Sequence, residues 1–474
     1  MKISNFEDER VHVLDANSSV WSVIRDIAES GTQEEAFYVC DIGDIVRKHK
    51  IWKSAMPRVE PHYAVKCNDS LTVLEVLAAL GAGFDCASKT EINKVLSLGV
   101  DPNRIIFANP AKPLSHIRHA GDVGVNTMTF DNEVELHKVK RLFPDAKMVI
   151  RIRCDAEIAQ CQLGMKFGCD PETEAPHLLQ VARDLGIDVV GISFHVGSGC
   201  RDPPVFRKAI AASRKLFDYA ASLGFHFSLL DLGGGYPGGH GTSISEIAEI
   251  VNMALDDYFP DPSVHIIAEP GRFYVSSAYT LACNIHSIRA VGTKDAVTGN
   301  PTTHYMYYIN DGVYGSFNCV LYDHQHVVGI PLKEFSHSKL YSSSIWGPTC
   351  DGLDQVVEQT LLPEMQVGDW LVFEDMGAYT LPVASPFNGF PIPKVHVVAD
   401  ENVWMLLKDI LPLTEDHFVI GNIPASLKKG MDVNRDEDWS LPILPITITL
   451  PLCGDGPLIQ EHVLEYVDVG PINH

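Results

Sequence analysis

The sequence lacks the features that mark membrane and nucleic-acid-binding proteins. No stretch approaches the ~18 consecutive apolar residues of a membrane-spanning helix, and the first residues lack the apolar core of a signal peptide. Lys and Arg number 37 against 61 Asp and Glu, so the formal charge is −24, and no basic tract occurs. We therefore expect no membrane or nucleic-acid partner. A cationic small molecule suits the negative field, although many soluble enzymes are simply acidic.

Paired cysteines are also missing. The eleven cysteines are dispersed, and none forms a C-x-x-C pair. An odd, scattered set without a secretory signal indicates reduced thiols and neither a disulfide framework nor a zinc site. The expected location is cytoplasmic, and no metal is expected.

What the sequence does contain is a repeated alternation of short apolar runs and helix-like segments. Several of the helix-like segments end on Gly, as helix C-termini often do. Such alternation predicts parallel strands joined by right-handed crossovers, and eight units favour a (β/α)8 barrel. An open, doubly wound sheet is the competing architecture. The eight runs lie at 62–67, 84–87, 104–109, 126–130, 147–153, 188–195, 228–232 and 264–269.

After Arg272 the pattern changes to β-rich runs separated by Gly, Pro and Asn turns, which predicts a β domain. We therefore predict an α/β plus β protein in which residues 38–278 form the barrel. Residues 1–37 and 279–474 would form the second domain, because two runs near the N-terminus are also strand-like. The β-rich runs are 10–15, 36–41, 304–311, 370–375, 394–400 and 445–452.

Residues that carry chemistry recur where the predicted barrel strands end. In such barrels the active site lies at the C-terminal ends of the strands. A packed core would not collect these residue types at one mouth, so their convergence is the strongest signal in the sequence. They are Lys66, Asp85, Arg151, His195, Gly233, Gly234, Gly235 and Glu269.

The stretch "LLDLGGGYPGG" (229–239) opens a buried strand into three glycines. Glycines let backbone N–H groups approach a phosphate closely, although a tight turn needs glycines as well. The following "AEPGRF" (268–273) adds Arg272, and an arginine beside a glycine nest favours a phosphate ligand.

A strand-end lysine, a phosphate cradle and a carboxylate together match pyridoxal 5′-phosphate (PLP). This cofactor needs a Schiff-base lysine, a phosphate site and an acid at its ring nitrogen. Lys66 lies on an apolar strand, where we expect desolvation to lower its pKa; a surface ion pair is the alternative for this residue. His195 could stack on a planar ring, or be a buried structural histidine, and Ser198 could bind phosphate.

Eight segments, in order along the chain, resemble the ornithine decarboxylase family of barrel-type PLP enzymes. The resemblance spans residues 35–392. The segments are "PHYAVKCNDS", "FDCASKTEI", "SFHVGSGC", "LDLGGGYPG", "AEPGRF", "NDGVYGSFNC", "YSSSIWGPTCDGLD" and "EDMGAYT".

The resemblance implies a role for each matching residue. Lys66 would carry the cofactor, Glu269 would bond its ring nitrogen, and His195 would stack on the ring. The phosphate would be held by Ser198, Gly233, Gly234, Gly235, Arg272 and Tyr379. A supporting polar shell would comprise Asp85, Glu91 and Arg151. The substrate ammonium would be bound by Asp323 and Asp351, near Tyr322. Intersubunit contacts of a homodimer would involve Lys166, Gly377, Cys350 and Asp351.

Cys350 lies in "IWGPTCDGLD" (345–354), beside Asp351. The adjacent acid disfavours a thiolate nucleophile, and ligand spacing for a metal is missing. A plain buried thiol is the usual fate of cysteine. The resemblance implies instead that Cys350 donates a proton to the substrate Cα in the active site of the partner subunit.

The family resemblance implies decarboxylation of ornithine to putrescine, the entry step of polyamine biosynthesis. Lysine, arginine or an apolar amino acid remain alternative substrates, and an inactive homologue that binds antizyme is an alternative function. The segment 114–143 resembles the antizyme-binding stretch, which makes antizyme a candidate partner. The chain departs from the family at His62 and Tyr236, where Phe is usual, and its tail does not resemble the degradation signal of vertebrate members.

Overall fold

The structure is a computed structural model that describes residues 10–161, 163–294, 299, 301–335 and 338–420. Within these residues, no helix is both long and apolar enough to span a membrane. The predicted strand at 445–452 and the rest of the tail lie outside the described residues.

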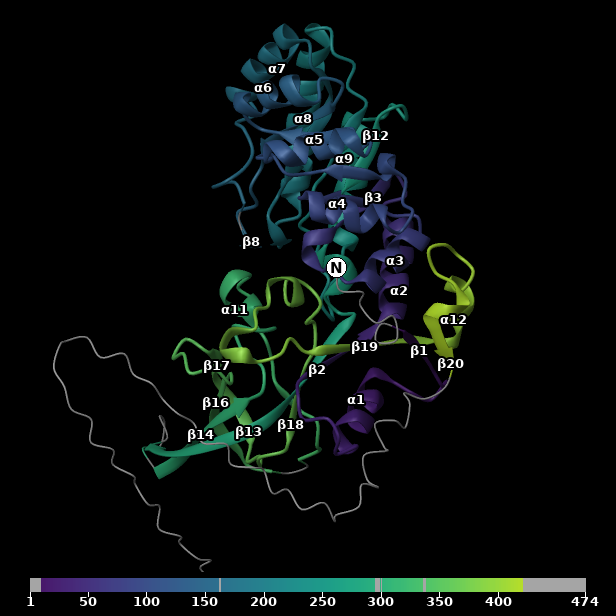
Figure 1. Ribbon diagram of the computed structural model, residues 1–474. Coiled ribbons are helices and arrows are strands. Elements are labelled where there is room, and N and C mark those ends of the chain that lie inside the picture. The colour runs from purple at the N-terminus through teal and green to yellow at the C-terminus, as the bar shows by residue number, and fades with distance from the viewer. Residues whose placement is uncertain (1–9, 162, 295–298, 300, 336–337, 421–474) are drawn as a thin grey trace, which may run out of the picture. The chain divides into compact units, whose positions relative to one another are not determined.

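Eight parallel strands close into a barrel, as the alternating pattern predicted (Figure 1). Each predicted run contains or overlaps one strand. In barrel order they are β11 (Leu229–Asp231), β12 (His265–Ala268), β3 (Val59–Ala64), β4 (Gly83–Cys86), β5 (Ile105–Phe107), β6 (Thr127–Phe130), β7 (Lys147–Arg153) and β9 (Asp188–His195).

Helices connect the barrel strands, and Figure 1 shows several of them around the strands. In α8 the residues Val205, Phe206, Ala209 and Ile210 form a buried apolar face. The connecting helices are α3 (Leu71–Ala79), α4 (Lys89–Leu96), α5 (Leu114–Asp122), α6 (Glu133–Leu142), α7 (Glu174–Leu185), α8 (Pro204–Ser222) and α9 (Ser245–Tyr258). The remaining helices are α1 (Val20–Glu29), α2 (Ile42–Ala55), α10 (Arg272–Val275), α11 (Asn318–Tyr322) and α12 (Glu401–Leu407).

The β domain is built on a ten-stranded mixed sheet, in the order β17-β16-β14-β13-β2-β19-β1-β20, with β18 joining β13 to β15. Its strands are β1 (Val11–Leu14), β2 (Phe37–Asp41), β13 (Tyr279–Lys294), β14 (Pro301–Ile309), β15 (Ile330–Pro331), β16 (Leu340–Trp346), β17 (Gln355–Pro363), β18 (Trp370–Phe373), β19 (Lys394–Asp400) and β20 (Phe418–Ile420). A separate two-stranded ribbon pairs β8 (Ala159–Cys161) with β10 (Ser198–Cys200).

Strand β2 crosses the domain boundary that the sequence predicts after residue 37. It pairs with β13 through Tyr279↔Cys40 and with β19 through Val398↔Asp41, so residues 38–41 lie in the sheet and not in the barrel. The N-terminal segment thus contributes the middle of the sheet, because β2 supplies hydrogen-bonding partners on both of its edges.

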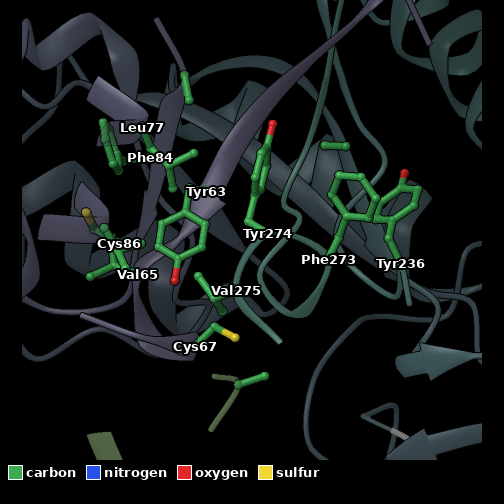
Figure 2. Close-up of a cluster of buried hydrophobic side chains, with 14 of the residues drawn as sticks. Tyr63, Val65, Cys67, Leu77, Phe84, Cys86, Tyr236, Phe273, Tyr274 and Val275 are labelled. Carbon is green, nitrogen blue, oxygen red and sulfur yellow. The ribbon is translucent and has the colours of Figure 1, made fainter. Parts of the chain in front are cut away.

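The chain just after β3 packs into the apolar core. Val65 and Cys67 are fully buried beside Tyr63 and Val275 (Figure 2). Val65, Lys66 and Cys67 form a short 3₁₀ turn, in which Val65 and Cys67 are buried. Lys66, between them, is the residue of this turn that is directed away from that core. Lys66 is therefore in a turn after the strand and not within the strand itself.

Candidate active site

Lys66 and Asp85 form an ion pair at the C-terminal ends of two adjacent strands. Asp85 is completely buried, and its Oδ1 atom has no hydrogen-bond partner among the described residues. Lys66 is 40% exposed and lines a cavity together with His195, Glu269 and Tyr379. The lysine amine is thus held by a buried acid while it faces open space.

The pKa of Lys66 is raised, which contradicts the expectation from its apolar neighbours. Burial alone lowers the pKa of this amine, but the negative charges of Asp85 and Glu269 more than offset that effect. The expectation weighed only the burial of Lys66, although Asp85 and Glu269 were already predicted at the same mouth, and their charges outweigh burial. The ion pair with Asp85 therefore favours the charged form of the Lys66 amine.

Glu269 follows β12 and is 9% exposed. Burial raises its pKa well above the usual range, and the nearby acids Asp231 and Asp85 raise it further. Burial likewise raises the pKa of Asp231, to about 6. Glu269 is therefore a carboxyl group that can hold a proton and share it with a basic nitrogen placed in the cavity. Sequence reasoning missed Asp231; its position directly before the glycine run was the available signal.

His195 ends β9, where its burial favours the neutral form of the imidazole. Burial lowers its pKa well below 6.5, and the charges of Arg151 and Lys66 act in the same direction. The backbone N–H of Gly197 donates to its Nδ1 atom over 3.0 Å, which leaves the ring proton on Nε2. A Cβ at Gly234 would lie 2.6 Å from Nε2, so only glycine leaves room for this ring.

Two of the three glycines after β11, Gly234 and Gly235, line a second, adjoining cavity. Gly233 and Gly235 have positive φ angles, of 61° and 116°, which favour glycine. A Cβ at Gly235 would stand 2.8 Å from the carbonyl of Gly197. The turn therefore exposes backbone without side chains, as a phosphate cradle requires.

Arg272 closes this cradle at the start of α10. Its Nη2 atom donates to the hydroxyl of Ser198 over 3.1 Å and to both carboxylate oxygens of Asp323, at 2.7 and 2.6 Å. The guanidinium lies 5.3 Å from the ring centre of Tyr379, which has a positive φ of 56°. Such backbone strain in a non-glycine residue is typical of functional sites.

The remaining predicted residues lie around this centre. Glu91 does not line the cavity; its carboxylate accepts the N–H of Ala87 behind Asp85. Arg151 and Lys166 both lie over the ring of Phe167 and line the cavity, as does the 71%-exposed Tyr322. Gly377 packs against the backbone: a Cβ there would lie 1.7 Å from the carbonyl of Val275.

Cys350 and Asp351 do not line the cavity that contains Lys66. Cys350 is exposed, and its backbone N–H donates to Asn388 Oδ1 over 3.2 Å. The carboxylate of Asp351 accepts the hydroxyl of Tyr314 and the N–H of Leu353, and these two bonds lower its pKa. A single chain therefore presents this pair outward, apart from its own lysine.

Comparison with known proteins identifies the family. Residues 42–276 match the pyridoxal binding domain of pyridoxal-dependent decarboxylases. The chain is 50% identical to ornithine decarboxylase of Rattus norvegicus over 444 residues, 90% of this chain and 96% of that one. The chain belongs to the ornithine decarboxylase family.

Two other relatives show how the family varies. Antizyme inhibitor 2 of Xenopus laevis is 50% identical over 83% of this chain and 88% of its own. The crystal structure of the Paramecium bursaria Chlorella virus arginine decarboxylase bound to agmatine superposes with a TM-score of 0.75 at 38% identity, over 80% of this chain and all of that one. The prediction of a barrel-type PLP decarboxylase is thus confirmed.

The residues present fit PLP. The glycine turn, Ser198 and Arg272 offer donors for a phosphate, and the Nε atom of Arg272 is buried without a hydrogen-bond partner among the described residues. Lys66 and Glu269 border the adjoining cavity, where a ring attached to Lys66 would extend. In the part of the chain that the structure describes, no cluster of His, Cys, Asp and Glu is suited to a metal ion.

Proposed function

We propose that the protein decarboxylates L-ornithine to putrescine and CO₂, the entry step of polyamine biosynthesis, in the cytoplasm. The observation that carries the proposal is the buried acid Asp323 on the wall of the cavity that also contains Lys66 and Glu269. Two ends of a diamino acid could be bound there at once, one at the lysine and one at the acid. Identity of 50% with ornithine decarboxylase over 90% of the chain supports the same substrate.

Each residue of the cofactor site has a task in this proposal. When bound, PLP supplies a ring that accepts the electron pair left on the substrate Cα as CO₂ departs. Glu269 would lie at the ring nitrogen as a carboxylate, where its negative charge would stabilise the protonated ring. The neutral His195 would cover one ring face without adding charge. Asp85 would orient the amine of Lys66.

The phosphate would lie in the cradle at the edge of the ring. Its donors would be Ser198, Arg272 and the backbone of the three glycines, with Tyr379 beside Arg272. These donors lie near the ends of barrel strands, and Tyr379 comes from a separate segment. The barrel would hold them at a fixed spacing before the ligand binds, which lowers the entropy lost on binding.

The far ammonium of ornithine would be held by Asp323 and by Asp351 of a second copy of the chain. Partly desolvated ammonium groups require carboxylates, and two acids suit a group with three donors. Asp351 and Cys350 are directed outward in one chain, so a homodimer with shared sites would bring them to the cavity. Lys166 and Gly377 would lie at that contact, and Tyr322 would border the substrate.

Cys350 would then act as the proton donor to Cα after CO₂ departs. The proton must reach one carbon and not the neighbouring cofactor carbon, so the position of the thiol decides the product. The competing function is that of an antizyme-binding regulator, which the Xenopus laevis relative suggests. Arg118 and Arg141 are exposed on α5 and α6, so both would be accessible to antizyme.

Steady-state CO₂ release from ornithine, lysine, arginine and leucine tests the proposal. We expect the purified protein to show the visible absorption of a lysine-bound cofactor and the highest kcat/KM for ornithine. The variant Asp323→Ala is the matched control, since it should lose the preference for dibasic substrates. Preferred turnover of leucine would contradict the roles of both aspartates, and a colourless, inactive protein would favour the regulator.

A further inference from the structure

The ion pair between Arg272 and Asp323 joins the two halves of the active site. Both side chains are only 8% exposed, and both oxygens of Asp323 lie within 2.7 Å of Arg272 Nη2. Arg272 borders the phosphate cradle, whereas Asp323 borders the cavity of Lys66. The acid assigned to the substrate is therefore bonded to the arginine assigned to the phosphate.

Two glutamines fix this pair from the side. The amide nitrogen of Gln160 donates to the Asp323 carbonyl over 2.6 Å and to its Oδ2 over 3.1 Å. It also donates to Gln325 Oε1 over 3.2 Å, and that same oxygen faces Arg272 Nη1 at 3.5 Å. Gln160 comes from β8, Arg272 from α10, and Asp323 and Gln325 from the segment after α11, so three separate parts of the chain meet at this ion pair. The thiol of Cys161 adds a contact of 3.6 Å to Asp323 Oδ1.

A phosphate in the cradle would compete with Asp323 for Arg272. The Nη2 atom that bonds Asp323 also bonds Ser198, which lines the cradle. Two anions on one buried guanidinium repel each other, and the low dielectric of the site strengthens the repulsion. Each anion therefore weakens the binding of the other unless Asp323 moves. Asp323 already lines the substrate cavity, so a carboxylate released from Arg272 would face that cavity.

We propose that Gln160 and Gln325 are positioning residues that latch Asp323 onto Arg272, and that phosphate binding in the cradle releases Asp323 toward the substrate cavity. The proposal rests on the proposed function only for the identity of the group that Asp323 then binds. Before the cofactor binds, the Asp323 carboxylate balances the charge of the buried Arg272 guanidinium. The latch also makes the ammonium subsite available only in a loaded site, because the same carboxylate serves both.

The equilibrium between latched and released Asp323 is coupled to PLP binding, and this coupling determines whether a variant binds PLP more or less tightly. If PLP binds the released state, its apparent dissociation constant is the intrinsic one divided by the released fraction. Removing the latch raises that fraction and tightens PLP binding. A coupling in the usual range corresponds to about 5-fold to 150-fold in affinity.

The test is a titration of apo-protein with PLP, followed by quenching of tryptophan fluorescence, in the absence of any amino acid substrate. Asp323→Asn keeps the shape of the side chain and removes its charge, so we expect its Kd for PLP to fall about fivefold or more. Gln325→Ala should give a smaller decrease in the same direction, with kcat at saturating PLP within about twofold of wild type. Asp351→Asn is the control, because Asp351 does not contact Arg272; its Kd for PLP should equal that of wild type.

Weaker or unchanged PLP binding by Asp323→Asn would overturn the latch, since Asp323 would then only support Arg272. A thermal melt of each apo-variant separates this outcome from unfolding: weaker binding with an unchanged Tm counts against the latch. Because the titration contains no ornithine, the result is independent of the substrate assignment. Tighter PLP binding together with no turnover of ornithine would retain the latch and reject the proposed function.

Discussion

The barrel mouth and the 349–354 loop contrast sharply, although both carry residues assigned to one reaction. At the mouth, Lys66, Asp85 and Glu269 come from strand ends and are fixed by burial and charge. In the loop, Cys350 is exposed and has no place in the cavity of its own chain. One chain thus gathers the residues that fit the cofactor around one cavity, whereas Cys350 lies outside that cavity.

Replacing Lys66 should produce the largest effect, because it removes the centre of the mouth. Lys66→Arg keeps a cation next to Asp85 but cannot form an imine with a carbonyl, so we expect CO₂ release to fall about 10³-fold or more. Loss of the visible absorption of the lysine-bound cofactor is the accompanying measurement. Substantial activity in Lys66→Arg would mean that Lys66 only forms an ion pair.

Replacing Cys350 tests the loop. Cys350→Ala should bind PLP with unchanged affinity and still release CO₂, but much of the product should be an aldehyde formed by protonation at the wrong carbon. Product analysis by chromatography measures the ratio. Cys161→Ala is the matched control, since Cys161 lines the cavity of its own chain and should leave the product unchanged. Clean putrescine formation by Cys350→Ala would make that thiol structural.

His62 places an acid-sensitive group in the barrel below the mouth. Burial lowers its pKa to about 4, while the unfolded value is near 6.5. The charged groups around it are Glu60, which opposes the shift, and His265 and Arg104, which add to it. The folded state therefore resists protonation, so stability is complete above about pH 6.5 and falls as the pH decreases toward 4, by up to about 3 kcal/mol.

Denaturant unfolding at pH 7.5 and pH 5 measures this loss. We expect His62→Phe, which has no titrating group, to lose less stability between the two pH values than wild type. His137→Asn, at an exposed position on α6, should behave like wild type. An identical loss in His62→Phe and wild type would show that other groups control the acid response.

Tyr236 should give the smallest effect. Its ring packs 4.7 Å from Trp52 behind the glycine turn, and its hydroxyl is buried without a hydrogen-bond partner among the described residues. Tyr236→Phe should raise the free energy of unfolding by about 1 kcal/mol. Tyr63→Phe is the opposite case, because the Tyr63 hydroxyl donates to the Asn68 carbonyl over 2.8 Å, and its loss should destabilise by a similar amount. Equal effects of both variants would contradict this account.

Much of the mouth could be predicted from the sequence, because the barrel rule places every strand end on one side. Lys66, His195 and Glu269 were found in this way, and the glycine turn marked the cradle. The same rule brought Asp85, 19 residues away, to the mouth beside Lys66, but it did not show that the charge of Asp85 would outweigh burial. The pairing of Arg272 with Asp323 spans 51 residues and joins the barrel to the segment after α11, so no strand pattern in the sequence predicts it.

The run 36–41 was predicted as a strand near the N-terminus, and only the boundary at residue 37 divided it. The five residues of β2 are apolar enough for a barrel or a sheet, and only pairing with β13 and β19 decides between them. The shared-site assignments of Cys350, Asp351, Lys166 and Gly377 came from resemblance, and they stay predictions because a single chain cannot test them.

The most direct test of the central claim, that each site combines the mouth of one chain with the loop of another, is a subunit-mixing assay. Lys66→Ala and Cys350→Ala protomers are purified separately, combined in equal amounts and assayed for putrescine. Random exchange should place one intact site in half of the dimers, so putrescine formation should recover to about a quarter of the wild-type rate. If the mixture forms no more putrescine than the sum of the two separate variants, Lys66 and Cys350 act within one chain and the account is wrong.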